Sequence, residues 1–338
     1  MNENTGLPET LHEAVKYFGE NDNAWRFMVS LRWGKSGVIC PTCGSSDVRL
    51  ISTRKVWECK TKHEKRQFSV KVGTIFEDSP IALDKWFMAI WMVTNCKNGV
   101  SSYEIHRELG VTQKTGWFML HRIRLAMEAG TLMTRKFEGD VEADETFIGG
   151  KAINMHKADK KRRGITMGSM EHRTTVIGMI QRPTDDHPVS KVKAFVLPGL
   201  PTTQGATQTL RTNVEYWSNV FTDSSKVYDT AKARYIHAAV DHAEEYVRGN
   251  VHTNGMENFW SLLKRSIKGT YVSVAPTHLF RYVAEQTFRF NNRKDDNHDR
   301  FLSVVSKVVG LRLTYAALIT EDILCLPGSR PKRGKARA

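Results

Sequence analysis

The pattern of apolar and polar positions divides the 338-residue chain into helical, ribbon-like and strand-rich stretches. Apolar residues recur at three- and four-residue steps over 9–31 and over 83–128, which predicts helices, the second stretch being interrupted at 97–99 and 109–111. From residue 141 onward, strand patterns alternate with helical ones: strands over 141–149, 173–182, 191–197 and 219–223, and helices over 206–217 and from about 254. This alternation predicts an α/β domain with a sheet of mixed direction.

Composition indicates a polyanionic partner. The chain carries 50 lysines and arginines against 36 aspartates and glutamates, a formal charge of +14. No stretch approaches the roughly 20 apolar residues of a membrane span, and the first segment lacks the apolar run of a signal peptide. We expect a cytoplasmic protein, nucleoid-associated when bound to DNA, that takes neither a membrane nor a small molecule as its partner. A basic protein without a polyanionic partner is the plainer alternative.

Three of the five cysteines crowd into a stretch that predicts a zinc ribbon. Cys40-Pro-Thr-Cys43-Gly has the spacing of a zinc knuckle, and a second pair of ligands is expected roughly 15–20 residues later. Cys59 meets that expectation, but Lys62 occupies the position of its partner and His63 follows it. We predict a structural Cys₃His zinc site. The alternative is a ribbon that has lost its metal and is held by apolar residues.

Residues 99–127 predict a helix-turn-helix. Ser101 or Ser102 can cap the first helix, with Glu104 near the capping-box position, and Thr112 can cap the second after a short turn. Both caps use side chains that favour helix starts, so the sequence predicts where each helix begins.

The second of these helices carries polar residues outside its apolar stripe: Gln113, Lys114, Arg122 and Arg124. Such a helix fits a major groove, with Gln113 and Lys114 at its N-terminus near the base edges. An ordinary hairpin inside a helical core is the alternative.

Three acidic residues predict a site for a hard cation. Asp144 and Asp223 close short strand patterns, and Glu257 opens an amphipathic helix. Carboxylates at two strand ends and on a helix suit Mg²⁺ or Mn²⁺, which leave positions for phosphate oxygens. Glu142 lies on the same side of the first strand as Asp144 and either supports the site or is a surface charge, whereas Glu145 is expected to point to the opposite face.

The helix near residue 254 adds positive charge. Its apolar residues form one narrow stripe: Met256, Phe259, Trp260, Leu263 and Ile267. Glu257 lies beside that stripe with Lys264 and Lys268 on the same flank, an arrangement suited to a phosphodiester, although a plain surface pattern on a core helix is the alternative. Asn254 can cap the helix, and the basic segment 151–163 is either a DNA clamp or a solvated loop.

Long motifs occur in order over nearly the whole chain: CPTCGS, RQFSVKVGTIFEDSPI, LDKWFMAIWM, GVS with LGVTQKT, ADETFIGGK, HTNGMENFWSLLKR and RYVAEQTFRFNNR. Together they resemble the bacterial insertion-sequence transposases of the DDE class, in the group with an N-terminal zinc ribbon. The resemblance implies an RNase-H-like catalytic domain in which Asp144, Asp223 and Glu257 match the metal-binding triad. It also implies recognition of terminal inverted repeats by the N-terminal modules. Lys62 departs from the family pattern, which has a cysteine there.

The expected fold is multidomain α/β. Its parts are a helical segment 1–37, a zinc-ribbon-like module 38–80, a helix-turn-helix module 81–130, the catalytic domain 131–300, and a C-terminal helix with a basic tail 301–338. The expected activity is Mg²⁺-dependent cleavage of double-stranded DNA at transposon ends and strand transfer into target DNA, by a homo-oligomer. Two alternatives stay open: an RNase-H-like nuclease or resolvase, and a transposase-derived regulator that binds DNA without cleaving it.

Overall fold

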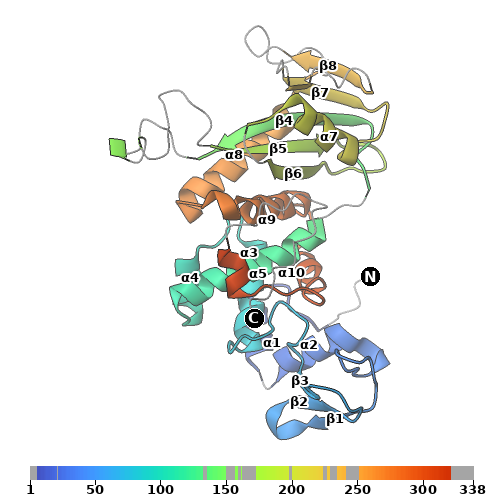
Figure 1. Cartoon of the computed structure of the whole chain (residues 1–338), viewed down its shortest axis with the longest axis vertical. Helices are drawn as coiled ribbons and strands as arrows, with labels where there is room; N and C mark the ends of the chain where they lie inside the picture. The colour runs from blue at the N-terminus through green and yellow to red at the C-terminus, as the bar shows by residue number, and fades with distance from the viewer. Residues whose placement is uncertain are drawn as a thin grey trace, which may run out of the picture. The chain divides into compact units, whose positions relative to one another are not determined.

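The computed structural model describes residues 6–20, 22–131, 135–149, 157–158, 161, 173–197, 200–223, 227–228, 234–240 and 251–320. The basic segment 151–163, apart from 157, 158 and 161, and the basic tail beyond 320 lie outside the described residues. The chain forms two compact units, Met1–Leu132 with Asn292–Leu318 and Met133–Asn291 with Ile319–Ala338 (Figure 1). Within the described residues, no helix is both long and apolar enough to cross a membrane.

The first unit joins helices to a small antiparallel sheet (Figure 1). Its α-helices are α1 (Leu11–Gly19), α2 (Asn23–Trp33), α3 (Leu83–Asn95), α4 (Ser102–Leu109), α5 (Gln113–Thr131), α10 (Asn297–Val305) and nearly all of α11 (Tyr315–Ile319). The sheet has the order β1-β2-β3, with strands β1 (Val48–Ile51), β2 (Val56–Cys59) and β3 (Gln67–Ser69). Short 3-10 turns lie at η1 (Gly34–Ser36) and η2 (Ser52–Arg54). Both expected N-terminal modules, 38–80 and 81–130, belong to this unit.

The helical prediction over 9–31 is met by two helices rather than by one continuous helix. The chain breaks between α1 and α2, where Asp22 adopts a left-handed φ of 63°. The apolar spacing continues across the break because rings from both helices enter one aromatic core with α3 and α10: Phe18, Phe27, Phe87 and Phe301.

The helices α4 and α5 form the predicted pair around a short turn. Ser101 and Glu104 make the predicted capping box, in which the Glu104 N–H donates to Ser101 Oγ at 3.2 Å and the Ser101 N–H donates to Glu104 Oε2 at 2.6 Å. The Thr115 N–H donates to Thr112 Oγ1 at 3.1 Å. Side chains in the sequence therefore predicted both helix starts correctly.

The helix α5 is buried on more sides than one apolar stripe predicts. Arg122 and Arg124, which lie outside that stripe in the sequence, are only 5% and 0% exposed, so they do not form a solvent-facing surface of the helix. Arg122 donates to the carbonyls of Ile75 at 2.9 Å, Glu77 at 2.8 Å and Leu313 at 3.1 Å. It thus joins α5 to two other segments of the unit.

The second unit contains a five-stranded mixed sheet in the order β6-β5-β4-β7-β8. The strands are β4 (Asp140–Ile148), β5 (Thr174–Gln181), β6 (Lys191–Leu197), β7 (Asn219–Asp223) and β8 (Ile236–Val240). β4 pairs antiparallel with β5, as β5 does with β6, whereas β4, β7 and β8 run parallel. This mixed α/β architecture confirms the expected fold class and is consistent with an RNase-H-like fold.

Helices cover both faces of this sheet (Figure 1). The helix α7 (Thr203–Asn213) packs on one face, against Val141, Ala143, Ile177 and Met179. The helices α8 (Asn254–Ser266) and α9 (Leu279–Asn291) pack on the other, against Val176, Ile180 and Val192. α8 continues as a π-helical turn, η5 (Ile267–Tyr271), and the 3-10 turn η6 (Pro276–His278) precedes α9. The alternation of side chains along β4 and β5 therefore gives two separate cores.

The helix α8 approaches β5 closely because Gly178 has no side chain. A Cβ atom at this position would lie 2.4 Å from Met256 Cε and 2.7 Å from Trp260 Cη2, well inside van der Waals contact. Gly178 pairs with Asp144 across β5 and β4, so the close approach occurs beside a predicted metal ligand.

Replacing Gly178 with alanine should destabilise the second unit by about 1–3 kcal/mol, because the new methyl group overpacks the contact with α8. Gly269→Ala is the matched control, since a Cβ there meets nothing within 4 Å. Thermal unfolding measures both variants, and a Gly178→Ala midpoint equal to that of the control would contradict the packing argument.

Candidate functional site

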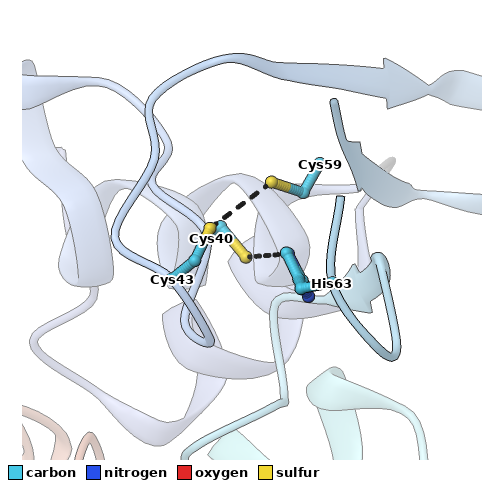
Figure 2. Close-up of side chains that lie close together, drawn as sticks. All are labelled: Cys40, Cys43, Cys59 and His63. Carbon is cyan, nitrogen blue, oxygen red and sulfur yellow. Dashed lines mark hydrogen bonds between the residues drawn. The ribbon is translucent and has the colours of Figure 1, made fainter. Parts of the chain in front are cut away.

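Four side chains of the ribbon converge on one point, as Figure 2 shows. Cys40, Cys43, Cys59 and His63 each offer a ligand atom, and these four atoms all lie within 4.8 Å of one another. Cys40 Sγ lies 3.4 Å from His63 Nε2, and Cys43 Sγ lies 3.6 Å from Cys59 Sγ. Three sulfurs and one imidazole nitrogen fit a closed tetrahedral zinc site, so the donor set supports a structural zinc ion.

The neighbours of His63 prepare its ring as a ligand. Its Nδ1 lies 2.6 Å from the carbonyl oxygen of Glu64, which can only accept a hydrogen bond, so Nδ1 carries the hydrogen. The lone pair then stays on Nε2, the atom that faces Cys40. Lys62 is exposed. The fourth ligand of the cluster is therefore His63, one residue after the position where a cysteine was expected.

Hydrogen bonds favour the thiolate form of two of the three cysteines, whereas the pKa of Cys43 is raised by burial and by the neighbouring thiols. Burial raises the pKa of Cys40, but backbone N–H groups of Cys43 and Thr42 outweigh it and the pKa is lowered. Burial likewise raises the pKa of Cys59, and hydrogen bonds from the Cys43 thiol and the Thr61 backbone outweigh it. Since the thiolate is the form that binds metal, both shifts favour zinc.

A second group of ligand atoms lies where two parallel strands separate. The last paired residues of β4 and β7 are Glu142 and Phe221, and Asp144 and Asp223 lie two positions further along each strand. Residues related in this way point to the same side of a sheet, so the two carboxylates are brought together. With Glu145 they form a group whose oxygens lie within 4.8 Å of one another.

The electrostatics of Asp144 fit a cation. Burial, followed by the negative charges of Asp223 and Glu145, raises its pKa to about 7. The Trp260 indole N–H, which donates to Asp144 Oδ2 at 2.9 Å, opposes that shift. Carboxylates that repel one another in a half-buried place are stabilised by a divalent ion, because its charge offsets both burial and repulsion.

Glu145 lies closer to the site than strand alternation indicated. It was expected to point to the opposite face, yet one of its carboxylate oxygens lies within 4.8 Å of ligand oxygens of Asp144 and Asp223. Nearby Tyr228 is fully buried, and burial together with Glu145 and Asp144 raises its pKa well above the usual value. The phenol therefore stays protonated beside the carboxylates.

Glu257 lies in the first turn of α8 and is exposed. It is not a member of the group of three acidic residues found in the described part of the chain. It does precede Trp260 by one helical turn, and the Trp260 side chain reaches Asp144. The structure thus brings Asp144 and Asp223 together and leaves Glu257 on the neighbouring helix.

The predicted DNA-binding residues lie in different settings. Gln113 donates through Nε2 to Ser102 Oγ at 2.8 Å, which ties its amide to the start of α4. Lys114 is exposed, with Nζ 4.6 Å from the centre of the Tyr315 ring. Lys264 on α8 and Lys268 in η5 are both exposed.

The sequence pattern did not predict two features of this site. Trp260 belongs to the apolar stripe of α8, so nothing in the pattern marked its indole N–H as a partner of Asp144. Asn254 was a candidate cap, but Thr253 is the N-cap residue and its side chain makes no capping hydrogen bond. The Met256 N–H donates instead to Glu142 Oε2 at 3.0 Å. The only sequence signal for the contact between Glu142 and α8 was the presence of several acidic residues next to Asp144.

Comparison with known families matches two regions of the chain. Residues 136–291 match the ISXO2-like transposase domain, and residues 19–61 match the transposase zinc-ribbon domain. The chain is also 29% identical over 263 residues to a protein of Halobacterium salinarum described as an uncharacterized protein in transposable element ISH50. That similarity covers 74% of this chain and 84% of the relative.

The purified protein should contain one zinc ion per chain, and His63→Ala should lose most of it because three thiolates leave the site open to chelators. Lys62→Ala is the matched control, since it changes the adjacent exposed residue. Elemental analysis after dialysis against a mild chelator gives the zinc content. Full zinc in the His63→Ala protein would exclude His63 as the fourth ligand.

In the absence of divalent metal, Asp223→Asn should raise the melting temperature by about 2–4 °C, because it removes a charge that repels Asp144. Added Mn²⁺ should stabilise the wild-type protein and leave the variant unchanged. Calorimetry with chelator and with Mn²⁺ tests both statements, using Asp186→Asn, an exposed carboxylate, as control. If Mn²⁺ raised the melting temperatures of Asp223→Asn and Asp186→Asn equally, Asp223 would not be a metal ligand.

Proposed function

Since the chain belongs to the insertion-sequence transposases that combine a zinc ribbon with an ISXO2-like transposase domain, we propose that it cleaves DNA at the ends of its own element and joins them to target DNA. The observation that carries the proposal is the pair Asp144 and Asp223, held together just beyond the last paired residues of the parallel strands β4 and β7, with the pKa of Asp144 raised to about 7.

Asp144 and Asp223 would hold Mg²⁺ or Mn²⁺, and Glu257 on α8 would be the third ligand. When bound, such ions activate the attacking water or 3′-hydroxyl and stabilise the leaving oxygen of the phosphodiester. The donor set supports the assignment of Asp144 and Asp223, because it offers oxygens alone, which hard cations prefer. Glu145 adds a fourth carboxylate close enough to adjust the charge of the site.

The protein's own groups orient the reaction. The Trp260 N–H holds one oxygen of Asp144, which fixes the direction of the carboxylate. Lys264 and Lys268 lie on the exposed side of α8 and η5 and receive the phosphates of the bound strand. No side chain needs to act as a covalent nucleophile, since the attacking hydroxyl belongs to water or to DNA.

The first unit supplies recognition of the DNA. The zinc ribbon and the α4–α5 pair bind the terminal inverted repeats, with Lys114 and Gln113 at the start of α5 near the bases. Gln113 must release Ser102 or contact DNA with its remaining acceptor. Two ends are joined in one reaction, so the protein acts as a homo-oligomer on double-stranded DNA, in the cytoplasm at the nucleoid.

Two other functions could use the same DNA-binding elements and carboxylates. A nuclease or resolvase would hydrolyse DNA without joining it, and a regulator would bind DNA without cleaving it. The zinc ribbon supports the transposase over the nuclease, since it is a transposase domain. The cluster around Asp144 supports the transposase over the regulator, because a protein that only binds DNA has no use for carboxylates that repel one another.

A strand-transfer assay with pre-cut element ends, Mg²⁺ and a target plasmid distinguishes the three functions. We expect joined products from the wild-type protein. Asp223→Asn should bind the ends with unchanged affinity and lose at least about a thousandfold in joining, because metal-held charge is the main source of catalysis. Asp186→Asn should join normally. Cleavage without joining would favour the nuclease, and binding alone the regulator. Full joining by Asp223→Asn would remove Asp223 from the site.

A further inference from the structure

Glu142 is a buried carboxylate that the proposed chemistry leaves without a role. It lies two positions before Asp144 on β4 and is only 2% exposed. It does not belong to the acidic group of Asp144, Glu145 and Asp223 in the described residues. A charge buried this deeply is tolerated only when partners compensate it, so its contacts indicate its purpose.

Both oxygens of Glu142 are engaged. Oε1 accepts a hydrogen bond from Arg182 Nε at 2.8 Å, and His252 Nδ1 lies 3.4 Å away from the same oxygen. Oε2 accepts the Met256 N–H at 3.0 Å. Arg182 also donates to the backbone carbonyl of His252 at 2.8 Å. The pair Glu142–Arg182 therefore ties β4 to the segment that leads into α8.

The contact between Glu142 and α8 replaces a helix cap. Thr253 makes no capping hydrogen bond with its side chain, so the first N–H groups of the helix need another acceptor. A carboxylate at this end also interacts favourably with the helix dipole. Gly255 permits the contact, since a Cβ there would lie 2.8 Å from Glu142 Oε2.

The two elements joined in this way carry the proposed metal ligands. Asp144 lies two residues after Glu142 on β4, and Glu257 directly follows Met256 on α8. We propose that Glu142, with Arg182, is a positioning residue that fixes the start of α8 against β4, so that Glu257 reaches an ion held by Asp144 and Asp223. This inference rests on the proposed function. Glu142 itself binds no metal, because its oxygens are used.

Glu142→Gln is the informative substitution. Glutamine keeps an acceptor for the Met256 N–H but loses the charge that holds Arg182, so α8 keeps a cap with a weaker anchor. We expect the Mn²⁺ concentration for half-maximal DNA cleavage to rise about tenfold, as for other groups that orient metal ligands. Binding of element ends should stay unchanged.

The matched control is Glu285→Gln. Glu285 is also a buried carboxylate paired with an arginine, Arg289, in the same unit. Arg289 contacts Ser266 at the opposite end of α8, far along the helix from Glu257. Loss of either ion pair should lower the melting temperature. Only Glu142→Gln should change the Mn²⁺ requirement, so stability and positioning are measured separately.

Three results decide the matter. A tenfold shift for Glu142→Gln, with less than about a twofold shift for Glu285→Gln, supports positioning. Equal shifts in both variants, or none in Glu142→Gln, overturn it while leaving the proposed function intact. A wild-type protein without Mn²⁺-dependent cleavage refutes the proposed function and this inference with it.

The double variant Arg182→Gln with Glu142→Gln tests whether the two residues act together. Its Mn²⁺ requirement should rise by less than the product of the two single-variant shifts, since both substitutions remove one interaction.

Discussion

The close packing of α8 on the sheet is the contact on which the second unit depends. Gly178 leaves room for Met256 and Trp260, and Trp260 then reaches Asp144. A helix held further away would expose the apolar side chains between α8 and β5, and the indole N–H would lose its acceptor. The same contact therefore stabilises the core and orients a carboxylate, which is why a small residue in the middle of β5 matters.

The opposing interaction is repulsion between carboxylates. Asp144, Glu145 and Asp223 lie within reach of one ion, and without it they destabilise one another. The surrounding fold compensates this cost through backbone pairing and through the hydrophobic packing of α7, α8 and α9. A stable scaffold around a strained site is the usual arrangement in proteins whose function needs such groups, since stability and activity compete there.

Much of this architecture could be predicted from local pattern. Alternation of side chains gave the strands β4 to β7, and capping residues such as Ser101 gave the helix starts, because both depend on neighbours in sequence. The break at Asp22 was missed, since the apolar spacing runs through it. Burial of Arg122 was missed because one helix cannot reveal how many segments surround it.

The candidate site was only partly predictable for a related reason. Asp223 follows from a strand end, which the sequence reveals, whereas Asp144 lies within β4, and the approach of the two carboxylates follows from the parallel register of β4 and β7. The position of the Glu145 carboxylate depends on how β4 and β7 separate beyond their last paired residues. The partners of Glu142 come from the residue after β5 and from α8. Such contacts are long-range in sequence, so a pattern along a single strand or helix cannot contain them.

The histidine in the ribbon changes the charge of any zinc complex formed there. Three thiolates and a neutral imidazole give a complex with one net negative charge, where four thiolates would give two. Lys62 and Lys65 lie exposed near it, while Lys60 pairs with Asp47 and Arg66 with Glu58. A polyanion approaching this module would therefore meet half the opposing charge that a four-cysteine ribbon would present from the metal.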